Sequence, residues 1–175
     1  MIKEASLHTI QFVYSKNRTT TIEKYPLLTP FLPMKQYSVY LNFNGRTEEA
    51  FNFYRSVLGG ELTMLQRFKD YPQMGPVPDN EKDRILHVSL SLGKAGVLMG
   101  SDTLESRKMN VLFGNNAHIS LEPESEEEAK RLFDGLSAGG KVDFPLQKTF
   151  WGALYGMFAD RYGVLWMINY TYPPR

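Results

Sequence analysis

The chain has 175 residues, a length that suits one domain or two small fused modules and that can bury a core without disulfides or structural metals. Its 20 Lys and Arg balance 19 Asp and Glu, and the net charge of +1 excludes nucleic-acid binding through a broad basic surface. The absence of cysteine excludes disulfides, thiolate metal sites and cysteine nucleophiles. No apolar run reaches the ~18 residues of a membrane span and no secretory signal is recognisable, so we expect a cytoplasmic protein without membrane contacts.

Residues 1–33 differ from the rest of the chain. Leu7–Tyr14 is rich in β-branched and aromatic residues, and three prolines lie between Tyr25 and Met34. Two interpretations stay open for this segment. It is an arm that adds a strand or packs on a partner, or it is a non-native extension before a start at Met34.

From Met34 onward the sequence is regular. A strand is expected at 37–43, followed by a helix that Thr47 caps. The helix has one apolar face, made of Ala50, Phe53, Tyr54, Val57 and Leu58, at offsets of 3, 4, 7 and 8 residues. Gly59-Gly60 ends the helix, and further strands are expected at 61–68, 84–92 and 95–99.

The second half repeats this order. A strand is expected at 117–121, and Ser125 with Glu128 forms a capping box for the next helix. Its apolar face is Ala129, Leu132, Phe133 and Leu136, and strands are expected at 141–144, 153–159 and 164–170. A repeat of about eighty residues, each strand–helix–three strands, therefore organises the chain into two modules, at about 36–100 and 117–171. Residues 69–83, with three prolines, are expected to form a mobile loop.

Several motifs carry a family resemblance that covers Met34–Tyr170. They are Tyr40–Gly45, Glu49–Tyr54, Leu58–Glu61, Ile85–His87 and Met99–Asp102, and then Pro145–Gly152, Tyr155–Met157, Asp160–Gly163 and Trp166–Asn169. With the tandem βαβββ order, they resemble the PhnB-like branch of the vicinal oxygen chelate (glyoxalase/bleomycin resistance protein/dioxygenase) superfamily. The resemblance implies an α+β fold in residues 34–175, with two modules whose curled mixed sheets surround a central cavity and whose helices lie outside.

The resemblance also implies where a catalytic metal would bind. The superfamily's metalloenzymes take two ligands from the first and fourth strands of each module. Those positions fall on Ser38 or Tyr40 and on Leu98 in the first module, and on His118 and Met167 in the second. His118 alone is a good ligand, so we expect no catalytic metal and no other cofactor. His87 and His118 with waters remain a weak candidate pair.

Other reactive residue types have simpler explanations. The acidic residues within 122–128 suit the first turn of a helix. Asp102, Asp160 and Arg161 lie near turns, where capping is the common role. Ser101 with His118 lacks the glycine-flanked elbow of a serine hydrolase.

A set of aromatic, sulfur-containing and imidazole side chains is the candidate ligand-binding cavity. Its members are Tyr40, His87, Met99, His118, Phe150, Trp151, Tyr155 and Met167. Large apolar residues also build cores and dimer interfaces, and this alternative stays open for the ring-rich segment at 150–155.

We therefore expect a PhnB-like protein that binds an unidentified small organic molecule as a homodimer, without a catalytic metal. A divalent-metal-dependent isomerase, lyase or dioxygenase is one alternative, and a ligand-sequestering resistance protein is another, so whether the chain is an enzyme stays open. Members of this branch are often labelled 3-demethylubiquinone methyltransferases. The sequence gives that label no support, because it lacks the glycine loop and parallel βαβ spacing of a methyl-donor nucleotide site.

Overall fold

The structure is a computed structural model, and it describes residues 37–173. The arm at 1–33, with its expected strand at 7–14, lies outside the described residues. Within the described part of the chain, no helix is long and apolar enough to cross a membrane.

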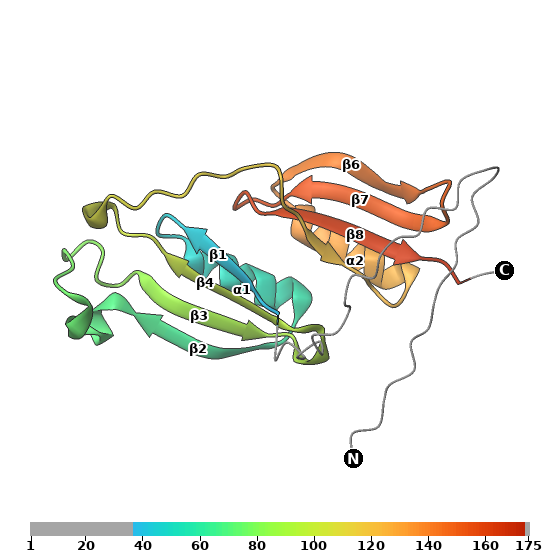
Figure 1. Ribbon diagram of the computed structural model, residues 1–175. Helices are drawn as coiled ribbons and strands as arrows, with labels where there is room; N and C mark the ends of the chain where they lie inside the picture. Colours follow the sequence, from blue (N-terminus) through green and yellow to red (C-terminus); the bar gives the residue numbers. More distant parts are fainter. Residues whose placement is uncertain (1–36, 174–175) are drawn as a thin grey trace, which may run out of the picture. The chain divides into compact units, whose positions relative to one another are not determined.

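The first module contains four strands and one long helix (Figure 1). Their bounds are β1 Val39–Phe43, α1 Thr47–Leu58, β2 Glu61–Arg67, β3 Ile85–Ser91 and β4 Val97–Asp102. The sheet order is β1-β4-β3-β2, in which β1 pairs with β4 in parallel and the other pairs are antiparallel.

The second module repeats this topology after a connection that contains the short 3-10 helix η4, Glu105–Arg107. Its elements are β5 Ile119–Leu121, α2 Glu126–Ser137, β6 Lys141–Lys148, β7 Ala153–Ala159 and β8 Leu165–Thr171. The order β5-β8-β7-β6, with β5 parallel to β8, matches the first sheet strand for strand. The α+β fold of tandem βαβββ modules is therefore confirmed, and each sheet is open rather than closed into a barrel.

One hydrophobic core spans both modules, because each helix covers one face of its own sheet and the two helices also contact each other. The Tyr54 ring on α1 lies 5.5 Å from the Trp166 ring on β8. Arg131 of α2 donates a hydrogen bond of 2.6 Å to the Val57 carbonyl of α1. Among residues 37–173, no helix packs on the opposite face of either sheet.

Two strand glycines bring the helices close to the sheets. A Cβ on Gly100 in β4 would lie 2.6 Å from a ring carbon of Phe51 on α1. A Cβ on Gly156 in β7 would lie 2.5 Å from a ring carbon of Phe133 on α2. Both values are below any real carbon contact, so each phenylalanine ring needs a glycine beneath it.

The two helices begin differently. The predicted cap of α2 is confirmed, because Ser125 Oγ accepts a 3.1 Å hydrogen bond from the Glu128 N–H. The predicted cap of α1 is wrong, because Thr47 is the first helical residue and makes no cap. Asp102 at the end of β4 takes that role instead and accepts from both the N–H and the hydroxyl of Thr47, at 3.0 and 2.6 Å.

The proline-rich loop after β2 has structure of its own. It contains the 3-10 helices η1, Phe68–Asp70, and η2, Pro72–Met74. Near its end, the 2% exposed Glu81 accepts hydrogen bonds from the N–H groups of Glu105 and Ser106 and lies 3.3 Å from Arg84. The loop is thus tied to the start of η4.

Candidate functional site

Burial alternates along the central strands and defines two faces on each sheet. On β4, Leu98, Gly100 and Asp102 are buried beneath the helix, whereas Val97, Met99 and Ser101 are half-buried on the other side. On β8, Trp166 and Ile168 are buried, and Met167 and Asn169 are half-buried. We call the sides that face away from α1 and α2 the open faces of the first and second sheets.

The open face of the first sheet is mainly polar. The Tyr40 hydroxyl lies 3.2 Å from Nδ1 of His87, and this contact joins β1 to β3 across the intervening strand β4. The Ser101 hydroxyl donates to the Asn42 side-chain oxygen at 3.1 Å, and Gln66 of β2 donates to the Tyr71 hydroxyl. Three predicted site residues, Tyr40, His87 and Met99, therefore share one face.

The open face of the second sheet is mainly aromatic and sulfur-containing. The rings of Trp151 and Tyr155 are 5.8 Å apart, and those of Tyr155 and Phe144 are 5.7 Å apart. Met157 of β7 pairs directly with Met167 of β8. Tyr155, Trp151 and Met167 were predicted, whereas Phe144 and Met157 were missed. Alternation would have found Met157, two residues from Tyr155 on the same strand.

Phe150 and Trp151 form the tip of the hairpin between β6 and β7. Phe150 is 98% exposed and Trp151 is 54% exposed, so neither belongs to the core of the described chain. Their rings are 4.9 Å apart and perpendicular. The two rings therefore form an exposed aromatic surface at the hairpin tip.

The four positions that correspond to metal ligands can be assigned from strand register. Val39 pairs with Leu98 and Tyr40 with Met99, just as Ile119 pairs with Trp166 and Ser120 with Met167. His118 and Ser38 directly precede these paired strands, so the counterpart of Met167 is Met99. The assignment of Leu98 was wrong, since its side chain is 4% exposed and lies in the core.

This donor set does not fit a catalytic divalent ion. Ser38, Met99, His118 and Met167 supply one imidazole, one hydroxyl and two soft thioethers. The candidate pair is divided between the modules, because His87 lies on β3 of the first sheet and His118 directly precedes β5 of the second. Within residues 37–173, no group of three or more His, Asp or Glu side chains is placed to hold a metal.

The buried carboxylates serve the fold. Asp160 is 4% exposed and accepts hydrogen bonds from the Tyr54 hydroxyl and the Trp166 indole, each at 2.8 Å. Burial is the main cause that raises the pKa of Tyr54, and the negative charge of the nearby Asp160 raises it further. Arg161 donates to the Ala138 carbonyl at the end of α2. The capping and turn roles expected for Asp102, Asp160 and Arg161 are therefore confirmed.

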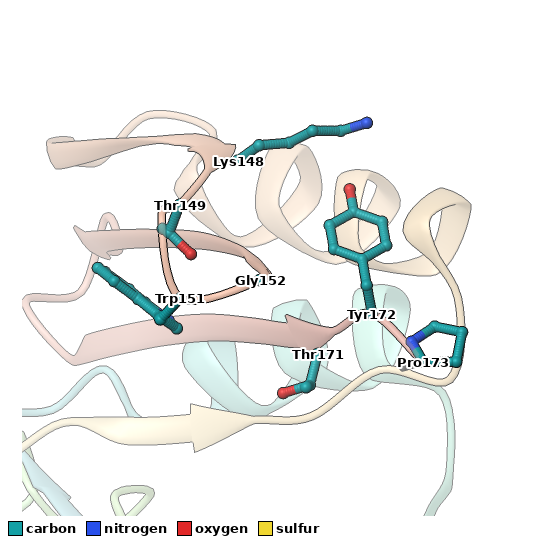
Figure 2. Close-up of a pocket in the computed structure, with 7 residues that line it drawn as sticks. All are labelled: Lys148, Thr149, Trp151, Gly152, Thr171, Tyr172 and Pro173. Carbon is teal, nitrogen blue, oxygen red and sulfur yellow. The ribbon is translucent and has the colours of Figure 1, made fainter. Parts of the chain in front are cut away.

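The surface of the described residues also contains hollows. One of about 640 Å³ lies at the end of β8 (Figure 2) and is lined by Lys148, Thr149, Trp151, Gly152, Thr171, Tyr172 and Pro173. Burial, helped by a 2.8 Å hydrogen bond to Glu126, raises the pKa of Tyr172 to about 12. In Figure 2 the Trp151 ring points away from Tyr172 and Lys148, so the rings of this hollow do not converge.

A second hollow of about 400 Å³ lies beside the start of α1. The guanidinium groups that line it are already paired. Arg67 contacts Glu48 at 2.7 Å, and Arg84 contacts Glu105 at 3.1 Å. The positive charges that line this hollow are therefore already neutralised by ion pairs within the fold.

Comparison with known proteins identifies the family. Residues 39–168 match the model of the Glyoxalase/Bleomycin resistance protein/Dioxygenase superfamily. Protein YjdN of Escherichia coli K12 is 32% identical over 143 residues, which are 75% of this chain and 92% of that protein.

Solved structures agree with this match. Protein PA1353 from Pseudomonas aeruginosa is 41% identical, with a TM-score of 0.68 over 78% of this chain and 97% of that one. A Bacillus cereus PhnB protein, described as a putative 3-demethylubiquinone-9 3-methyltransferase, is 26% identical, with a TM-score of 0.63 over 78% of this chain and all of that one. The chain therefore belongs to the glyoxalase/bleomycin resistance protein/dioxygenase superfamily, with a PhnB protein among its structural neighbours.

Proposed function

We propose that the chain is a PhnB-like small-molecule-binding protein that binds its ligand on the open sheet faces without a catalytic metal. The observation that carries this proposal is the side-chain chemistry of those faces. Two of the four positions equivalent to metal ligands hold Met99 and Met167, whereas the surrounding positions hold rings, hydroxyls and amides. Such a lining suits an organic molecule, which is bound by apolar contact and oriented by a few hydrogen bonds.

The fold also bears on the methyltransferase description of the Bacillus cereus relative. A methyl-donor nucleotide site of the doubly wound type needs neighbouring parallel strands joined by crossover helices. Each sheet described for this chain has one parallel pair, at β1 with β4 and at β5 with β8, and neither pair is consecutive in sequence. We therefore propose binding rather than methyl transfer.

Metal analysis tests the proposal directly. Protein purified without chelator should contain far less than one Zn, Ni, Fe or Mn per chain by elemental analysis, and His118→Ala should not change that content. Adding Zn²⁺, Ni²⁺ or Mn²⁺ should not shift the melting temperature of either protein. Stoichiometric metal that is lost in His118→Ala would overturn the metal-free proposal and favour the metalloenzyme alternative.

We further propose that the working form is a homodimer. Members of this superfamily typically bind small molecules and form dimers. The exposed Phe150 and Trp151, together with the 45% exposed Tyr40, offer apolar surface to a second copy. A stable interface needs roughly 1,200–2,000 Å² in total. Light scattering at micromolar concentration should give twice the chain mass, and a monomeric mass would contradict the proposal.

A further inference from the structure

The open face of the second sheet has a continuous aromatic and thioether surface. Its rings are those of Trp151, Tyr155 and Phe144, each tilted by 62–69° to the next. Beside them, Met157 and Met167 face each other across β7 and β8. Thioether sulfurs and ring edges both pack well against the face of another aromatic ring.

This face carries no formal charge on its two central strands. The residues that alternate with the buried ones are Tyr155, Met157 and Ala159 on β7, and Leu165, Met167, Asn169 and Thr171 on β8. An ionised ligand group placed here would lose its water without gaining a counter-charge, which is costly. The Tyr155 hydroxyl and the Asn169 amide, whose Nδ2 lies 3.5 Å from the Thr171 hydroxyl, can bind neutral polar groups.

We infer that this face binds a neutral, planar aromatic ring system that carries hydrogen-bonding groups. The inference rests on the proposed small-molecule function and adds the chemical class of the ligand. The ligand ring lies over the methionine pair, with Trp151 at one side. The hollow at the end of β8 shares Trp151 and Thr171 with this face but adds a positive charge, the Lys148 ammonium, which is 71% exposed.

The chain contains its own reporter for this site. It has two tryptophans, and Trp166 is 1% exposed with its indole bonded to Asp160. Trp151 is 54% exposed and touches the proposed site. A ligand on the open face should therefore change the emission of Trp151 and leave that of Trp166 constant, so Trp151→Phe should remove the signal. Because Trp151 also lines the hollow at the end of β8, variants of Met167 and Lys148 distinguish the two places.

The test compares three probes by calorimetry and tryptophan emission at pH 7. They are 1-naphthol, which is neutral, 1-naphthoate, which has the same rings with a carboxylate, and cyclohexanol, which has no aromatic ring. We expect 1-naphthol to bind at least tenfold more tightly than either of the others. Met167→Lys, or Asn169→Lys if the first variant does not fold, should reverse the order of the two naphthalenes. Lys148→Met is the matched control and should change nothing.

The outcomes separate the inference from the function on which it rests. Tighter binding of 1-naphthoate that is lost in Lys148→Met would place the site in the hollow and overturn the ligand class, while binding as a function stands. Binding of 1-naphthol without any change in Trp151 emission would overturn the location. If none of the probes binds and native mass spectrometry shows no retained ligand, the proposed function itself fails.

Discussion

Asp160 joins the two modules through a single carboxylate. It accepts from the Tyr54 hydroxyl of α1 in the first module, and from the Trp166 indole and the Val164 N–H in the second. A buried carboxylate is stable when its lone pairs are filled in this way. Its role is to fix α1 against the second sheet, which explains why a buried acid need not be catalytic.

Tyr54→Phe should therefore destabilise the protein while leaving the ring packing intact. Loss of one hydrogen bond to a buried charge costs about 1–3 kcal/mol. Chemical denaturation should show this as a lower midpoint with an unchanged slope. Tyr162→Phe is the matched control, because Tyr162 bonds Asp160 through its backbone N–H and its ring lies 6.1 Å from that of Tyr54. An equal loss in both variants would contradict the role given to the Tyr54 hydroxyl.

Glu81 should make stability depend on pH in the acid range. Hydrogen bonding from Ser106, helped by the Glu105 N–H and by Arg84, lowers the pKa of Glu81. A carboxyl whose pKa is lower in the folded chain stabilises the fold above its unfolded pKa, and this contribution disappears as pH falls through the folded pKa. Glu81→Gln should thus lower the melting temperature at pH 7, and the difference from wild type should shrink below about pH 4.5. A difference that grows on acidification would exclude this linkage.

At the scale of the secondary-structure elements, the contact between each helix and its sheet depends on one glycine. Gly100→Ala would force its methyl into the Phe51 ring, and we expect a loss of about 1–3 kcal/mol from overpacking. Phe51→Leu removes the atoms that clash, so adding Gly100→Ala in that background should cost less. Urea unfolding of the four proteins in this cycle measures the coupling, and strictly additive losses would disprove the clash.

Sequence periodicity predicts the elements better than it predicts their ends and faces. The helix at Thr47–Leu58 follows from its apolar spacing, but its cap comes from Asp102, 55 residues away in the chain. Local sequence contains no sign of that contact. For α2, the capping residue Ser125 is adjacent to the helix, and there the prediction was right.

The candidate site shows the same division between local and long-range information. A strand shifted by one residue moves every side chain to the other face. The short apolar run before Asp102 did not show whether Leu98 or Met99 faces the helix, and pairing with β1 resolves this. By contrast, the longer alternation of β8 placed Met167 on the open face from sequence alone.

At the scale of the molecule, the repeated module explains why chemistry and stability occupy different surfaces. The helix-covered faces of both sheets merge into one core that contains Phe51, Tyr54 and Trp166. The open faces contribute little to that core, so their side chains are free to differ between modules. One open face is polar around His87, and the other is aromatic around Tyr155.

A chain that starts at Met34 should fold without residues 1–33. The superfamily match begins at residue 39, and the Pseudomonas aeruginosa structure is covered over 97% of its length by 78% of this chain. A fold that relatives complete without the extra residues should form without them here. Residues 34–175 should therefore keep the circular dichroism spectrum, cooperative melting and 1-naphthol affinity of the full chain, with a small loss of melting temperature. Aggregation of the shortened chain, or loss of ligand affinity while melting stays cooperative, would show that residues 1–33 belong to the core or to the site.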